Sequence, residues 1–103
     1  MTHQILIHAT TSNGVTTLEA LVKHPMDSGF VKDKAGKIIP PHYIEVITFT
    51  HAGKTVLTGF WGPAVSKNPF IKFSFKGGKS GDPIQISWVD NKGETASVGS
   101  KIM

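Results

Sequence analysis

The sequence predicts an all-β fold, an immunoglobulin-like antiparallel β-sandwich of about seven strands, within one domain that spans residues 1–103. Three observations indicate this fold. Apolar and polar residues alternate with a period of two along most of the chain, which is the pattern of half-buried strands. Helical periodicity is nearly absent. Glycine, proline, asparagine and aspartate separate the alternating segments at short intervals, as in two-sheet sandwiches.

Each predicted strand follows from its own alternating segment. In residues 15–23, for example, Leu18, Ala20 and Val22 share one face. The predicted strands, in chain order, are residues 3–9, 15–23, 43–50, 54–61, 70–76, 83–89 and 94–102. The segment 24–43 does not alternate, because prolines and glycines interrupt it, and it is expected to be irregular.

Composition limits the classes of function. The apolar fraction of 39% supports one hydrophobic core in a chain of 103 residues. All eleven basic residues are lysines and none is arginine, the residue that reads guanine edges, which disfavours sequence-specific binding of nucleic acid. The absence of cysteine excludes disulfides, thiolate metal sites and cysteine catalysis within this chain. No apolar stretch reaches the length of a membrane span.

The five histidines suggest a metal site, but their spacing does not support one. They stand at positions 3, 8, 24, 42 and 51, without any ligand spacing known from zinc sites. The most specific alternative is a periplasmic copper-binding β-sandwich in which His24 and Met26 supply nitrogen and thioether ligands. For each histidine, a place on the surface or in a turn is the preferred interpretation, and no metal or cofactor is expected.

The sequence offers no catalytic arrangement. The serines lack the context of a nucleophile elbow, and there is no helix to supply an oxyanion-binding dipole. Asp27 and Asp33 share one loop, where two carboxylates usually form turns or caps rather than an acid–base pair. The chain itself is therefore expected to be non-catalytic.

An uncharged segment with two adjacent aromatic residues suggests a protein interface. Residues 55–66 carry no charge and include Phe60 and Trp61. Neighbouring residues of a strand point to opposite faces, so one of the two aromatic side chains is expected to be exposed or covered by a partner. Exposed aromatic side chains are typical anchors of interfaces, and the interpretations of core plus interface and of core alone remain open together.

Three segments carry a resemblance to a known family. They are HPMDSGFVKDKAGKIIPPHYI (24–44), NPFIKFSF (68–75) and SWVDNKGE (87–94), and in combination they resemble the SoxZ family over nearly the whole chain. Asp27 and Ser28 replace the more common Glu and Thr of that family, which are conservative changes. Phe30 and Val31 stand where a basic residue is often seen.

The resemblance implies the small subunit of a sulfur carrier. Such a subunit forms a heterodimer with a SoxY-type protein, whose flexible C-terminal arm bears the reactive cysteine, and it makes transient contacts with the sulfur-oxidising enzymes of thiosulfate oxidation. It is expected to be periplasmic and to be exported together with its partner, since the amino terminus lacks the basic and long apolar regions of a signal peptide. The residues expected at the interface with the partner or its arm are His24, Pro25, Met26, Asp27, Gly29, Asp33, Phe60, Trp61 and Asn68.

Overall fold

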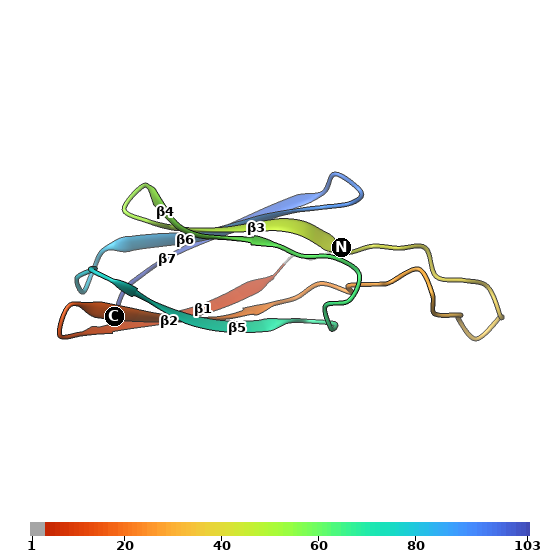
Figure 1. The fold of residues 1–103 in the computed structure, drawn as a ribbon, viewed down its shortest axis with the longest axis horizontal. Coiled ribbons are helices and arrows are strands. Elements are labelled where there is room, and N and C mark those ends of the chain that lie inside the picture. The colour runs from red at the N-terminus through yellow and green to blue at the C-terminus, as the bar shows by residue number, and fades with distance from the viewer. Residues whose placement is uncertain (1–3) are drawn as a thin grey trace.

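The computed structural model describes residues 4–103 and confirms the all-β prediction, with seven strands in two antiparallel sheets. The first sheet has the order β1-β2-β5 and the second β4-β3-β6-β7, and the two form the layers visible in Figure 1. This order is that of an immunoglobulin-like sandwich in which β4 adds an edge strand to the sheet formed by β3, β6 and β7. The strands are β1 (Ile5–Ser12), β2 (Val15–Val22), β3 (Ile44–His51), β4 (Lys54–Phe60), β5 (Phe70–Lys76), β6 (Pro83–Asp90) and β7 (Thr95–Lys101).

Alternation locates the core between the sheets, as expected. Leu18, Ala20 and Val22 of β2 are buried, and Ile84 and Ile86 of β6 face them from the other layer. Edge-to-face packing of Phe49 on Phe73, with ring centroids 4.9 Å apart, joins the two sheets near the middle. The predicted strand boundaries differ from the observed ones by a few residues at most, and His3, which opens the first predicted strand, lies outside the described residues.

Turn chemistry explains where the strands reverse. Asn13 and Gly14 both have positive φ, at 52° and 75°, as the two-residue hairpin between β1 and β2 requires. Ala52 and Gly53 do the same between β3 and β4. The β5–β6 connection passes from one sheet to the other, and there Gly78 has φ 90° and leaves no room for a Cβ beside Thr16.

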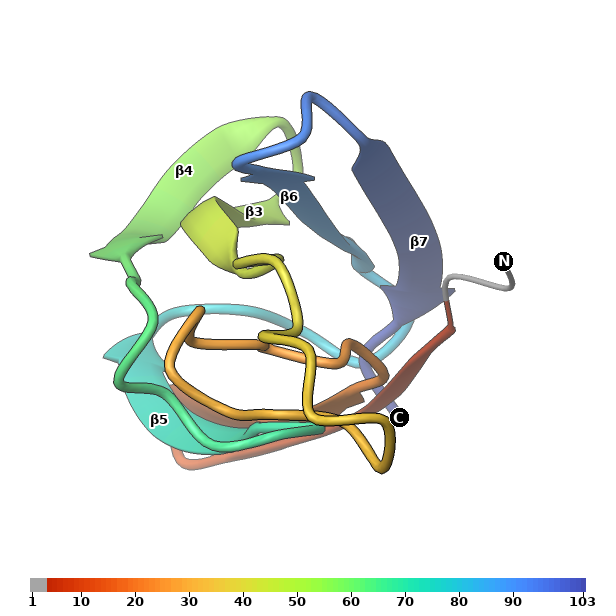
Figure 2. The same cartoon turned by 90° about the vertical axis from the view of Figure 1, so that its right-hand side faces the viewer.

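The segment between β2 and β3 is a projecting hairpin. Asp27 and His42 form an antiparallel bridge at its base, and Lys32 and Ile38 form another near its end. We call residues 27–42 the extension and residues 30–38, all of them exposed, its tip. Figure 1 shows the extension leaving one end of the sandwich, and Figure 2 looks onto that end, with the extension in front of both sheets. The molecule is elongated as a result, 53 × 21 × 20 Å.

Candidate functional site

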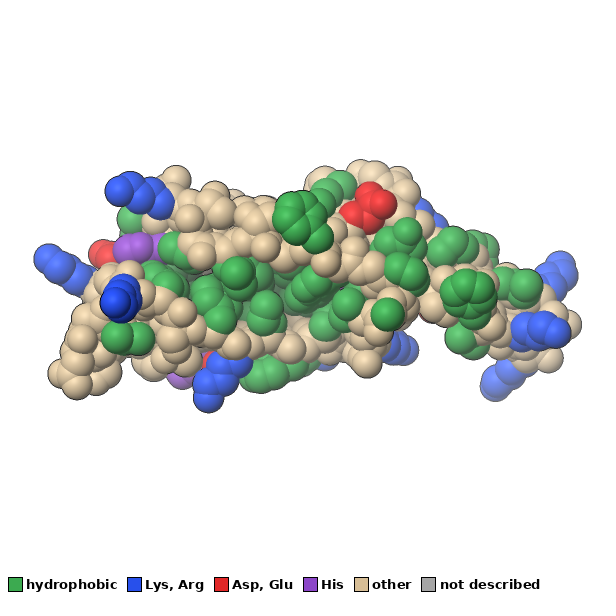
Figure 3. Space-filling view, viewed as in Figure 1, with side chains coloured by type: hydrophobic (Ala, Val, Ile, Leu, Met, Phe, Trp, Pro, Cys, Tyr) green, Lys and Arg blue, Asp and Glu red, His purple; other side chains and the backbone are tan. Residues whose placement is uncertain are grey.

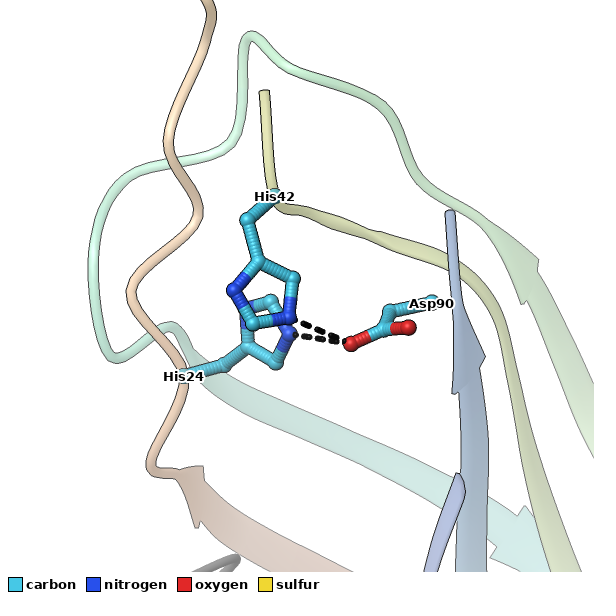
Figure 4. A group of neighbouring side chains, drawn as sticks. All are labelled: His24, His42 and Asp90. Carbon is cyan, nitrogen blue, oxygen red and sulfur yellow. Dashed lines mark hydrogen bonds and ion pairs between the residues drawn. The ribbon is translucent and has the colours of Figure 1, made fainter. Parts of the chain in front are cut away.

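A buried cluster of His24, His42 and Asp90 lies at the base of the extension (Figure 4). His24 follows β2, His42 precedes β3, and Asp90 ends β6. Each lies two positions from the buried apolar residue at the nearest end of its strand and therefore points to the same, inward face. The three side chains thus meet between the sheets. His24 is 2% exposed, His42 3% and Asp90 1%. The cluster thus links both sheets to both ends of the extension.

All four lone-pair positions of the Asp90 carboxylate are used. Its Oδ2 accepts hydrogen bonds from His24 Nε2 at 3.2 Å and from His42 Nε2 at 2.7 Å. Its Oδ1 accepts the backbone N–H groups of Lys92 and Glu94, at 3.0 and 2.9 Å, and so shapes the β6–β7 turn. One buried carboxylate therefore holds two histidines and a turn together.

Burial and hydrogen bonding act in opposite directions on the pKa of Asp90. Desolvation, the largest effect, raises the pKa because it disfavours the charged form. The bonds from His24, the Glu94 amide, His42 and the Lys92 amide stabilise the carboxylate and together outweigh burial. The pKa of Asp90 is therefore lowered, and the residue is an anion at neutral pH.

The surroundings of His24 fix its tautomer. Its Nδ1 accepts the backbone N–H of Met26 at 3.0 Å, so the ring proton sits on Nε2 and is donated to Asp90. The ring also packs edge-on against His42, with centroids 4.6 Å apart, and against Trp88, at 4.9 Å. Both ring nitrogens of His24 are thus occupied by structural hydrogen bonds.

This proton pattern is unsuited to a metal, although the three ligand atoms lie within 4.8 Å of one another. A neutral histidine that binds a metal through Nε2 carries its proton on Nδ1 and usually donates it to an acceptor. At His24 that nitrogen instead faces the N–H of Met26, which is a donor. Met26 is also engaged, since its Sδ accepts the Ile44 N–H at 3.4 Å. The arrangement supports a structural role.

The same contacts hold the backbone of the HPMDSG segment in an unusual conformation. Met26 has φ 49°, a left-handed conformation that costs a non-glycine residue roughly 1–2 kcal/mol. Its bonds to His24 and Ile44 stabilise it there. Asn68 fastens the segment from the other side, because its Oδ1 accepts the His24 N–H at 3.0 Å and its own N–H bonds to the His24 carbonyl. The start of the extension is therefore rigidly placed.

Comparison with known proteins identifies the family. The profile of the family described as "Sulphur oxidation protein SoxZ" matches residues 5–100. The chain belongs to the SoxZ family. This family has a role in the Sox system of sulfur oxidation. Membership in it implies a complex with a partner from that system. No curated protein matches the chain at a significant level.

Two solved structures are similar to this SoxZ-family chain in fold. One is a hypothetical protein, PH1083, from Pyrococcus horikoshii OT3, with a TM-score of 0.64 and 16% identity over 98% of this chain and 88% of that one. The other is a superoxide reductase in the oxidised state, with a TM-score of 0.59 and 15% identity over the same shares. At such low identity they support the sandwich architecture alone. Residues 4–103 hold no helix that is long and apolar enough to cross a membrane.

The residues expected at the interface of this SoxZ-family chain fall into two groups, those of the extension and its base and the aromatic pair Phe60 and Trp61. The first group, which holds most of them, shapes the base or the turn of the extension. Gly29 has φ 90° and packs against Pro41, Pro25 is half-buried, and Asp27 pairs with His42 through its backbone. The Oδ1 of Asp33 accepts the amides of Ala35 and Lys37 and so forms the turn at the tip.

The two adjacent aromatic residues point in opposite directions, as alternation requires. Phe60 is 80% exposed, whereas Trp61 is half-buried and packs against the core. Trp61 is therefore at least in part a core residue, and Phe60 is the side chain available to a partner. Of these two aromatic residues, Phe60 is therefore the one on the surface of this SoxZ-family chain.

The expectation of surface or turn positions for all histidines was wrong for two of them. His24 and His42 are buried because Asp90 satisfies both rings inside the sandwich. One signal in the sequence indicates that two of these side chains point inward, although not that they meet. His24 continues Leu18, Ala20 and Val22 at a spacing of two, and Asp90 continues Ile84, Ile86 and Trp88 in the same way.

Proposed function

We propose that this chain is the non-catalytic subunit of a heterodimeric, periplasmic sulfur carrier, and that it is exported with its partner. The partner is a SoxY-type protein that bears cysteine-bound sulfur intermediates and presents them to the enzymes of thiosulfate oxidation. The observation that carries the proposal is the SoxZ family match over residues 5–100. The absence of cysteine agrees with it, because a thiol that carries sulfur must then belong to another chain.

The outer face of the β4-β3-β6-β7 sheet is the surface best suited to a permanent partner. Its outward residues alternate with the buried ones and lie side by side through the sheet register. Apart from Lys101 at the end of β7, they carry no charge, in a chain with eleven lysines, and they are Val46, Thr48, Thr50, Thr58, Phe60, Gln85, Ser87, Val89, Thr95, Ser97, Gly99 and Lys101. Depletion of charge with an exposed aromatic anchor is typical of the centre of an interface.

A shallow groove makes this face suitable for packing against another sheet. The groove has a volume of about 370 Å³ and its lining includes Val46, Thr48, Ser87 and Ser97. Phe60 stands beside Val46 in the sheet register, at the margin of the same face. Side chains of a partner strand would fill the groove while Phe60 inserts between them. We therefore assign the SoxY-type partner to this face.

Co-expression with the SoxY-type partner tests the proposal. The two chains are expected to co-purify as one heterodimer and to remain together in size-exclusion chromatography at micromolar concentration. Recovery of two independent monomers at that concentration would contradict the proposal.

A pair of matched variants tests the assigned face. Thr48→Lys places a charge at the centre of the outer face and is expected to weaken the heterodimer by about 3 kcal/mol or more, because the charge would be buried without a partner. Thr10→Lys makes the same change on an exposed position of β1, on the other sheet, and is expected to have no effect. Equal behaviour of the two variants in the same chromatography would reject this face.

A further inference from the structure

The tip of the extension exposes apolar side chains to an unusual degree. Phe30 is 87% exposed, Val31 57% and Ile38 60%, and all three lie within nine consecutive exposed residues. They contribute nothing to the core of the sandwich. Exposed apolar side chains that gather in this way usually mark a surface that binds something.

Lysines surround these apolar side chains. Lys32, Lys34 and Lys37 stand on the same tip, and none of them forms an ion pair with a residue among 4–103. The one carboxylate there, that of Asp33, is held by the Ala35 and Lys37 amides. Figure 3 shows the hydrophobic and lysine side chains mixed at the projecting end of the molecule. The tip is therefore both apolar and positively charged.

The base of the extension is held by hydrogen bonds to the sandwich, whereas the tip is exposed to solvent. Asp27 and His42 exchange two backbone hydrogen bonds, of 2.7 and 2.9 Å, and His42 is fixed by Asp90. The isolated bridge between Lys32 and Ile38 continues the hairpin outward. A pre-oriented element loses less conformational freedom on binding than a loose loop would.

We propose that the extension tip inserts into an acidic, apolar-lined groove on an enzyme that visits the carrier, and that it does not bind the permanent partner. This inference rests on the proposed function. Carboxylates at the rim of the groove would meet Lys32, Lys34 and Lys37, and its apolar floor would receive Phe30. A permanent interface tends to exclude charge from its centre, as the middle of the outer sheet face does, whereas lysines at a rim accelerate brief encounters. Charge complementarity thus selects a transient protein partner.

The experiment uses the assembled heterodimer and each purified sulfur-oxidising enzyme that is encoded with it. Association and dissociation rates are measured by surface plasmon resonance at 50 and 300 mM salt. For at least one enzyme, the association rate of the wild-type carrier is expected to fall steeply with salt. The triple variant K32E/K34E/K37E is expected to associate about tenfold more slowly at low salt and to lose most of the salt dependence. Phe30→Ser is expected to raise the dissociation rate about tenfold.

A matched triple variant controls for net charge. K54E/K76E/K79E changes three exposed lysines of the sandwich, away from the outer sheet face, by the same amount and is expected to keep the wild-type rates. Because every residue of the tip is exposed, the tip variants are expected to fold normally, which thermal unfolding checks.

Three outcomes would overturn the inference. The first is that both triple variants change the rates equally. The second is that the tip variants fail to form the heterodimer, which would assign the tip to the permanent partner. The third is that the wild-type carrier, but not the tip variants, sediments with vesicles of anionic lipid while enzyme binding is unchanged. If the wild-type chain forms no heterodimer at all, the proposed function fails first, and this inference fails with it.

Discussion

At the scale of single residues, Asp90 has the largest influence on this molecule. It is the acceptor for His24, His42 and two backbone amides, and it is buried where an unbonded carboxylate would be very unfavourable. Removing the partners of a buried charge, or removing the charge from its partners, destabilises a protein more than most surface substitutions do. The base of the extension therefore depends on one ionised side chain.

Asp90→Asn is expected to lower the free energy of unfolding by about 3 kcal/mol at pH 7. The wild-type advantage also depends on pH. Since the folded pKa of Asp90 is lowered, its contribution is complete above the unfolded pKa of about 3.9 and is lost as pH falls through the folded value. The gap between wild type and variant should thus narrow below about pH 4. Urea unfolding at pH 7 and pH 3 measures it.

Asp33→Asn is the control for this prediction. The residue is exposed, and the oxygen of asparagine preserves the turn that Asp33 forms with Ala35 and Lys37. A gap between wild type and Asp90→Asn that is constant from pH 7 to pH 3 would contradict the role assigned to Asp90.

At the scale of elements, β4 shows how alternation assigns different roles to neighbouring residues. Phe60 ends the strand on its outer side, while Trp61 turns back against the core. The two side chains are of similar type, and only their positions in the pleat distinguish them. Substitutions at these two positions therefore report on different quantities.

Trp61→Ala is expected to lower the free energy of unfolding of the isolated chain by about 2 kcal/mol, because it leaves a gap beside the core. Phe60→Ser is expected to change that free energy by less than about 0.5 kcal/mol and to weaken the heterodimer instead. Denaturant unfolding of the isolated chain and titration with the partner distinguish the two effects. Loss of stability in the Phe60 variant, with heterodimer affinity intact, would contradict this division.

The strands could be predicted from the sequence, whereas the cluster could not, and the reason lies in the range of the interactions. Alternation in β2 or β6 is a local property that a few consecutive residues display. The cluster joins His24 to Asp90 across 66 positions, and its existence depends on which strands become neighbours. Phe60 and Trp61 were an intermediate case, because the sequence showed that they diverge but not which one faces out.

At the scale of the whole molecule, most of the large apolar residues that are exposed among residues 4–103 lie toward the end that bears the extension, and Val15 and Met103 are the exceptions. The side chains involved are Leu6, Phe30, Val31, Ile38, Phe60 and Phe70. The opposite end carries the β1–β2, β3–β4 and β5–β6 connections, with Lys54, Lys76 and Lys101 near them. The extension end is therefore the end at which contacts with other proteins are expected to concentrate.

The extension makes the molecule longer than a compact protein of its length. The Cα radius of gyration is 15.3 Å, against about 13 Å expected for a globular chain of this size. Small-angle X-ray scattering of the isolated chain is expected to show this elongation. Replacing residues 30–38 with a Gly-Gly linker should reduce the radius toward the compact value. An unchanged radius in that variant would mean that the extension folds back onto the sandwich in solution.

The buried carboxylate also has a consequence for the order of folding. Asp90 lies 48 positions after His42 and 66 after His24, so the base of the extension closes only when β6 has joined the sandwich. Contacts of such sequence separation form late, because a long loop must be ordered first. A chain in which β6 is not yet in place is therefore expected to lack a fixed direction for its extension. The projecting hairpin is thus expected to become recognisable to other proteins only after β6 has joined the sandwich.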